Sequence, residues 1–244
     1  MEEARNRLLV VSAHPGDVLW RCAGAVAKHV KEGGEARIIS LSYGIAGESV
    51  ALWKQEGMTA EKAKQIRVEQ MENAAKVLGA SCEIWDLPEY PFRPAVEDMY
   101  RLAAVLRTYQ PGIVLTHHDS DPLNPDHGLI LDFVKNAVEI AGADGIRIEG
   151  TVPGFDRPEI YCFEPHASEA SDFKPNVFID ITDVWEVKDA AMACMPDKAS
   201  IRKAYTERAI LRATNAKSFG RKGCKYAEAY RAFLPFARGG GFPR

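Results

Sequence analysis

The sequence predicts an α/β protein whose core is a doubly wound, mostly parallel sheet with helices on both faces. Short, continuously apolar runs such as residues 8–12 are typical of strands buried inside a parallel sheet. Segments with apolar side chains at helical spacing separate these runs. No internal repeat or low-complexity linker interrupts the alternation, so we expect one α/β domain over residues 1–244.

The first predicted unit is a strand, a helix and a second strand. Residues 8–12 form the first strand, and apolar side chains then recur at helical spacing over residues 18–30. The glycine pair at 33–34 ends this helix, and residues 36–42 form the second strand. A unit of this length is expected to be a right-handed crossover between two parallel strands.

The later elements continue the alternation. Helices are expected at residues 60–78, 96–109, 128–140, 184–194 and 198–213. Strands are expected at residues 82–87, 113–116, 160–164 and 177–181. Asp183 is expected to cap the helix that follows it. The chain from about residue 220 is rich in Gly and Arg, and we expect a mobile tail there.

Composition and charge exclude several classes of protein. The hydrophobic content of 46% and charged content of 27% are ordinary for a soluble globular protein. A net charge of −3 gives no support for nucleic-acid binding. Five widely spaced cysteines without a C-x-x-C pair argue against disulfides and thiolate zinc sites. Without a signal peptide or a membrane-spanning apolar run, we expect a cytoplasmic protein with no membrane contact.

Histidines gather where the predicted strands end. The loops that directly follow predicted strands contain His14, His117, His118, His127 and His166. Open α/β sheets bind their ligands at this edge. His14, Asp17 and His127 would form a set of two imidazoles and one carboxylate, which leaves a coordination position open, as in catalytic zinc sites. The alternative is that hydrogen bonds satisfy these loop residues, but two separate strand-end clusters favour a metal.

Two short motifs resemble those of the PIG-L/LmbE-like zinc deacetylases. Residues 12–17 (Ser-Ala-His-Pro-Gly-Asp) resemble the A-H-P-D-D motif, and residues 124–127 (Asn-Pro-Asp-His) resemble H-x-D-H. Arg67 and Glu69 resemble the R-x-E element. The resemblance covers most of residues 6–140 and implies a Rossmann-like fold with one zinc ion. The zinc ligands that it implies are His14, Asp17 and His127.

The sequence departs from the deacetylase pattern at two positions. Gly16 stands where the family's general base would be, and Asn124 stands where the first His of H-x-D-H would help stabilise an oxyanion. Loss of a positioned base typically costs about two to four orders of magnitude in rate. These departures retain the metal site and argue against amide hydrolysis. Alternatively, Gly16 only eases the turn, and Glu48 or Asp126 serves as the base.

Longer segments resemble the hydratase branch of the same superfamily, which also lacks the base Asp. They include residues 44–53, 121–127, 163–166 and 178–185, and the similarity continues through the last predicted helix. This resemblance implies a zinc-dependent hydro-lyase of gallate and protocatechuate meta-cleavage. Its substrate would be the tricarboxylate 4-oxalomesaconate or the enol tautomer 4-carboxy-2-hydroxymuconate. The alternatives are a zinc-dependent N-deacetylase of an N-acetyl sugar or related amide, and a catalytically silent binding protein.

The hydratase resemblance also implies roles for individual residues. Glu48 and His166 are the candidate acid/base pair, because both follow strands and can titrate near neutral pH. Asp126 is a further catalytic candidate. Arginine binds carboxylates through two parallel hydrogen bonds. The substrate-binding candidates are Asn124, Arg67, Tyr205, Arg208 and Arg212, with Arg21 and Arg93 behind them. The alternative for each arginine is that it lies on a solvent-exposed helix face and binds no substrate. We also expect a homo-oligomer.

Overall fold

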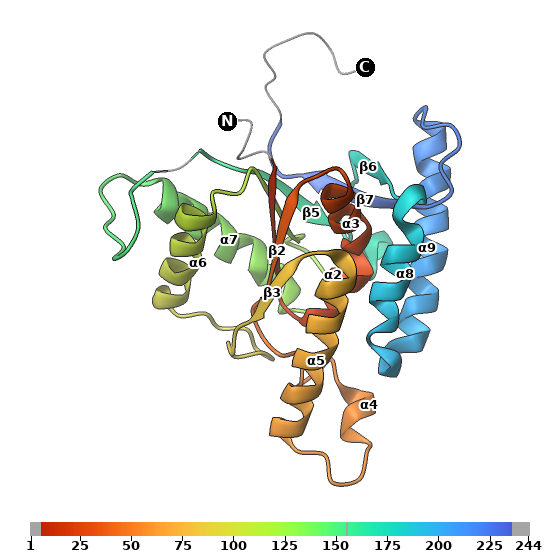
Figure 1. The fold of residues 1–244 in the computed structure, drawn as a ribbon, viewed down its shortest axis with the longest axis horizontal. Helices are drawn as coiled ribbons and strands as arrows, with labels where there is room; N and C mark the ends of the chain where they lie inside the picture. Colours follow the sequence, from red (N-terminus) through yellow and green to blue (C-terminus); the bar gives the residue numbers. More distant parts are fainter. Residues whose placement is uncertain (1–5, 155, 236–244) are drawn as a thin grey trace.

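The computed structural model describes residues 6–154 and 156–235, and its fold is built around one sheet (Figure 1). In these residues the sheet has seven strands in the order β3-β2-β1-β4-β5-β7-β6. The strands are β1 (Arg7–Ser12), β2 (Glu35–Ser40), β3 (Ser81–Ile84), β4 (Ile113–His117), β5 (Glu159–Phe163), β6 (Val177–Asp180) and β7 (Ala227–Ala232). Strands β1 to β5 pair in parallel, and β7 runs antiparallel to β5 and β6. The predicted mostly parallel α/β sheet is confirmed.

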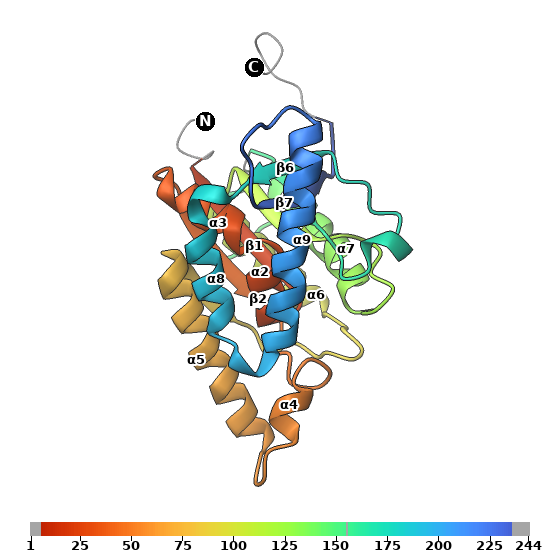
Figure 2. The ribbon, with the colours of Figure 1, turned by 90° about the vertical axis from the view of Figure 1, so that its right-hand side faces the viewer.

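Helices cover both faces of this sheet. The α-helices are α2 (Pro15–Arg21), α3 (Ala23–Lys31), α4 (Val50–Trp53), α5 (Ala60–Leu78), α6 (Val96–Tyr109), α7 (His127–Gly142), α8 (Trp185–Ala193) and α9 (Ala199–Ser218). Three 3-10 turns are η1 (Ser168–Ala170), η2 (Thr182–Val184) and η3 (Pro196–Lys198). Helices α6 and α7 pack on one face, whereas α2, α3, α5, α8 and α9 cover the other, with α8 and α9 side by side (Figures 1 and 2).

The apolar run of β1 follows from this double cover. Leu8 and Val10 pack into the core beneath α2 and α3, whereas Leu9 and Val11 pack into the core beneath α6 and α7. A strand alternates its side chains between two faces, so a strand covered on both sides needs apolar residues at every position. The continuous run therefore reports burial on both faces.

The helix expected over residues 18–30 is two helices. It breaks at Cys22, whose φ of −142° and ψ of 6° lie outside the helical region. The carboxylate of Glu228 in β7 accepts hydrogen bonds of 2.8 Å from the backbone N–H groups of Gly24 and Ala25, at the start of α3. Because this cap comes from a residue far along the chain, local spacing gave no sign of the break.

The segment expected to be a tail contains the strand β7, between β5 and β6. Its sequence Ala-Glu-Ala-Tyr-Arg-Ala is made largely of small residues, so it lacks the β-branched run that identifies the other strands. Long-range pairing forms this strand, and the prediction of a mobile tail from residue 220 is wrong over residues 227–232. Residues 236–244 lie outside the described part of the chain.

Asp183 does not cap α8, contrary to the sequence expectation. Its carboxylate forms ion pairs of 2.9 Å with Lys28 and Lys31 of α3, and Val184 occupies the N-cap position.

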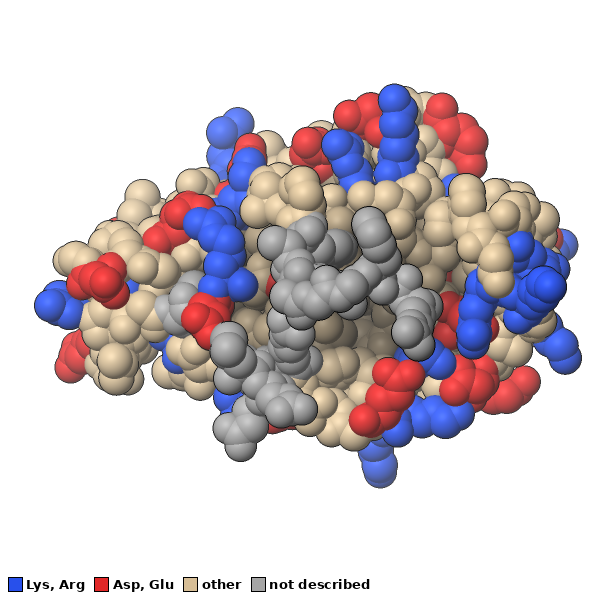
Figure 3. Space-filling view, turned by 90° about the horizontal axis from the view of Figure 1, so that it is seen from above, with Lys and Arg blue, Asp and Glu red and all other residues tan. Residues whose placement is uncertain are grey.

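Charged side chains of both signs are interspersed over the end of the molecule shown in Figure 3, in keeping with the small net charge. Within the described residues, no helix has both the length and the apolar character that a membrane crossing demands.

Candidate metal and active site

The two motifs meet at the carboxyl ends of neighbouring strands. His14 follows β1 and opens α2, whereas His127 is the first residue of α7, beyond β4. Strand β1 lies between β2 and β4 in the sheet. Crossovers leave in opposite directions at this point, and open α/β sheets place their ligands in the crevice that results. The fold therefore brings together histidines that are more than a hundred residues apart.

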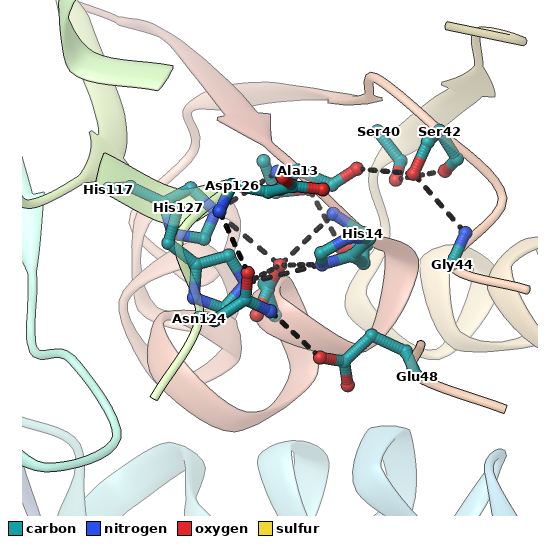
Figure 4. A network of polar contacts seen from close by, with 12 residues as sticks. Ala13, His14, Ser40, Ser42, Gly44, Glu48, His117, Asn124, Asp126 and His127 are labelled. Carbon is teal, nitrogen blue, oxygen red and sulfur yellow. Dashed lines mark hydrogen bonds and ion pairs between the residues drawn. The ribbon is translucent and has the colours of Figure 1, made fainter. Parts of the chain in front are cut away.

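Three donor atoms converge there (Figure 4). His14 Nδ1 lies 3.2 Å from His127 Nε2, and Asp17 Oδ2 lies 3.3 Å from each of these nitrogens. Ligands bound at about 2.0–2.1 Å to a tetrahedral zinc ion lie about 3.3–3.4 Å from one another. The donor types and their separations thus fit a zinc ion, and all three residues are buried. Asp17 Oδ2 also accepts the backbone N–H of His14, at 3.0 Å, which holds this carboxylate in place at the start of α2.

A carboxylate lies against the outer nitrogen of each histidine. His127 Nδ1 is 2.9 Å from Asp121 Oδ2, which favours the tautomer whose Nε2 lone pair faces the donor set. His14 Nε2 is 3.5 Å from Glu89 Oε2, a buried atom that has no hydrogen-bond partner among the described residues. Carboxylates placed in this way orient metal-binding histidines and raise their basicity. Sequence reasoning missed both roles, because neither carboxylate belongs to a short motif.

The carboxylate of Glu48 faces this cluster and is held by three donors. Its Oε1 accepts from the Asn124 amide at 3.0 Å (Figure 4). Oε1 also accepts from the Tyr90 hydroxyl at 3.4 Å, and Oε2 lies 3.2 Å from Lys198 Nζ. Burial and the charge of Asp17 act to raise the pKa of Glu48, but His14 and Lys198 outweigh them and lower it. Glu48 is therefore an ionised carboxylate beside the metal donors.

His166 lies on the other side of His127, with ring centroids 6.2 Å apart. Burial and the nearby Arg21 lower the pKa of His166 to about 4, and burial raises the pKa of Tyr205 to about 12. The imidazole and the phenol are both neutral near pH 7. The Tyr205 hydroxyl is 2.8 Å from His166 Nδ1, and in the tautomer whose Nδ1 accepts this hydrogen bond the ring proton is on Nε2. The geometry thus gives His166 one N–H donor.

Comparison with known proteins identifies the family. A family model for PIG-L, described as GlcNAc-PI de-N-acetylase, matches residues 9–138. The chain belongs to the PIG-L family. This confirms the resemblance seen in residues 12–17 and 124–127.

Relatives within the PIG-L family differ in the reactions that their names describe. The 4-oxalmesaconate hydratase of Pseudomonas putida is 38% identical over 239 residues, covering 96% of this chain and 92% of that protein. The crystal structure of GalB, the 4-carboxy-2-hydroxymuconate hydratase of Pseudomonas putida, superimposes with a TM-score of 0.91 and 38% identity, over 97% of this chain and 99% of that chain. The diacetylchitobiose deacetylase of Thermococcus kodakarensis is 27% identical over 75% of this chain and 66% of that protein.

Gly16 shows how this PIG-L chain departs from the deacetylase pattern. A Cβ atom built on Gly16 would lie 2.8 Å from Trp20 Nε1 and 3.6 Å from Met195 Sδ. Trp20 is 2% exposed, so its indole is enclosed by other protein atoms. The volume that an acidic side chain would need next to Asp17 is therefore filled by an aromatic ring.

Asp126 is the third residue of the second PIG-L motif, and both of its carboxylate oxygens accept hydrogen bonds. They accept the backbone N–H groups of Tyr90, at 2.7 Å, and Phe92, at 2.9 Å, and the side chain is buried. Asp126 thereby fixes the loop that presents Tyr90 to Glu48. Its placement favours a structural role over the catalytic role expected from the sequence.

The three arginines expected to bind substrate are directed at protein oxygens. Arg67 donates to Asp197 through both terminal nitrogens, at 3.1 and 2.9 Å, and also to Ser49. Arg208 donates to the backbone oxygens of Pro165 and His166, and Arg212 forms two hydrogen bonds with the Glu164 carboxylate. In this PIG-L chain these arginines position the loops that carry Glu48 and His166. Arg93 is exposed, and Arg21 is buried against Asp121.

Proposed function

We propose that this chain is a metal-dependent hydratase that adds water to the carbon–carbon double bond of 4-oxalomesaconate or 4-carboxy-2-hydroxymuconate. The observation that carries the proposal is a retained metal donor set with no room for an acid at Gly16, where Trp20 fills the space. The whole-chain similarity to a Pseudomonas putida hydratase supports the same reaction and substrate.

Different residues of the site would carry out different parts of the reaction. A zinc ion held by His14, Asp17 and His127 would act as a Lewis acid, polarising a substrate oxygen or lowering the pKa of bound water. Glu48, held as a carboxylate, accepts the proton of the attacking water while the hydroxyl oxygen bonds to one carbon. The same carboxyl then returns the proton to the neighbouring carbon. His166 donates its Nε2–H to a substrate oxygen on which negative charge builds up.

An absorbance assay tests this function. Purified protein loaded with zinc is mixed with 4-carboxy-2-hydroxymuconate, and loss of the ultraviolet absorbance of the conjugated system is followed. The His127→Ala variant is the control, because removal of one donor should abolish zinc binding and turnover together. Unchanged absorbance with the wild-type protein would reject the hydratase. Release of acetate from an N-acetyl sugar would support a deacetylase instead.

A further inference from the structure

Lys198 lies in a segment that contacts the Glu48 loop at two places, through its own ammonium and through Asp197. It ends η3, and its ammonium lies 3.2 Å from Glu48 Oε2 with 14% of the side chain exposed. The carboxylate of the neighbouring Asp197 accepts hydrogen bonds from both terminal nitrogens of Arg67, and Arg67 also donates to Ser49. Lys198 thus contacts Glu48 directly, and Asp197 is linked to Ser49 through Arg67. The position of the ammonium is fixed by the fold, although sequence reasoning gave Lys198 no role.

The ammonium of Lys198 retains donors for a further partner. A lysine ammonium has three N–H donors, and the described residues accept one hydrogen bond from it, at Glu48. The other cations near the site are committed to protein oxygens: Arg21, Arg67, Arg208 and Arg212. Lys198 therefore lies beside Glu48 with N–H donors that no described residue occupies, and it can bind an anion without giving up that contact.

We propose that Lys198 binds one carboxylate of the substrate and so favours anionic substrates over neutral ones. The inference rests on the hydratase function proposed above and concerns specificity. One ammonium would then hold the substrate carboxylate and the Glu48 carboxylate side by side, which places the substrate next to the group that moves the proton. A charge-assisted hydrogen bond of this kind changes affinity by about 10- to 100-fold when the charge is removed.

Kinetics of the zinc-loaded protein test the inference. In Lys198→Gln the positive charge is lost, but an amide donor toward Glu48 remains. We expect KM to rise about 10- to 100-fold with a smaller change in kcat, and Lys198→Arg to restore most of the affinity. Lys203→Gln is the matched control, because it removes the same charge from an exposed position on α9 and should leave KM unchanged.

A binding measurement separates this inference from the proposed function. Propane-1,2,3-tricarboxylate, which has no double bond to hydrate, is titrated into the zinc-loaded protein. Its affinity should fall at least about tenfold in Lys198→Gln and in Lys198→Met, whether or not the wild type hydrates 4-oxalomesaconate. The inference is overturned if the wild type does not bind this probe, if both variants bind it as the wild type does, or if kcat alone falls while KM is unchanged.

Discussion

The contacts of Glu48 hold it as an ionised carboxylate. The Asn124 amide, the Tyr90 hydroxyl and the Lys198 ammonium hold its two oxygens in place. A carboxylate must be ionised before it can accept a proton from the attacking water, and the lowered pKa of Glu48 keeps it ionised at neutral pH. In the proposed reaction the Asn124 amide orients the carboxylate that takes the place of the acid missing at position 16.

Replacing Glu48 tests this assignment. Glu48→Gln removes the charge and the proton acceptor but leaves the three metal donors untouched. We expect normal zinc content by elemental analysis and a kcat about 10²–10⁴-fold lower in the absorbance assay. Glu186→Gln, at an exposed position on α8, should behave as the wild type. A Glu48→Gln rate within a factor of three of the wild-type rate would remove Glu48 from the mechanism.

Residue roles could be predicted from the sequence only where a motif carries them. The grouping of His14, Asp17 and His127 follows from polar residues at strand ends, because parallel strands bring those ends together. The function of Arg67 could not be predicted, because its partner Asp197 lies 130 residues away. A guanidinium bound to a protein carboxylate and one reserved for a substrate carboxylate look the same in a sequence.

At the scale of elements, α2 and α3 are joined through a buried ion pair. Lys188 of α8 donates to Trp20 O at the end of α2 and to Glu228, whose carboxylate caps α3. Both side chains are buried. Lys188 and Glu228 therefore link the end of α2, the helix that carries Asp17, to the start of α3.

Breaking this pair should destabilise the protein strongly. In Lys188→Met the Glu228 carboxylate remains buried without its cation, which costs about 3–5 kcal/mol. Urea unfolding followed by circular dichroism measures the loss. The double variant Lys188→Met/Glu228→Gln should recover part of the stability, because no charge is then left unpaired. A loss below about 1 kcal/mol in the single variant would show that the pair does not hold the junction.

Elements with local signals were predicted closely, and those that depend on distant partners were not. Helix α5 spans Ala60–Leu78 as expected, because Thr59 caps its start and Gly79 ends it with a φ of 70°. Strand β7 lacks such signals and exists because β5 and β6 pair with it. The break at Cys22 likewise depends on Glu228, so no window of neighbouring residues contains its cause.

At the scale of the whole molecule, the far edge of the sheet contains an acid-sensitive contact. Asp180 at the end of β6 accepts from Thr182 N at 3.0 Å and from Arg221 Nε at 2.7 Å. Burial acts to raise the pKa of Asp180, but these hydrogen bonds lower it to about 2 from an ordinary 3.8. A pKa lowered by folding stabilises the protein above pH 4, and that contribution is lost as the pH falls from about 4 to about 2.

The variant Asp180→Asn shows this contribution directly. At pH 7 its thermal unfolding midpoint should lie a few degrees below that of the wild type, and the difference should narrow as the pH falls below about 4. Differential scanning calorimetry between pH 7 and pH 3 measures both midpoints. Asp144→Asn, at an exposed position, should match the wild type throughout. A difference that stays constant over this range would mean that the contact does not depend on the charge of Asp180.

The indole of Trp20 also bears on how a hydratase and a deacetylase can diverge on one scaffold. An aspartate at position 16 would collide with the ring, and a shorter side chain at position 20 would leave a hole where a buried tryptophan had been, costing about 3–5 kcal/mol. Each change alone is therefore expected to destabilise the protein. Only an acid at position 16 together with a smaller side chain at position 20 would avoid both the collision and the cavity. The residues at positions 16 and 20 are therefore coupled through the packing of this one ring.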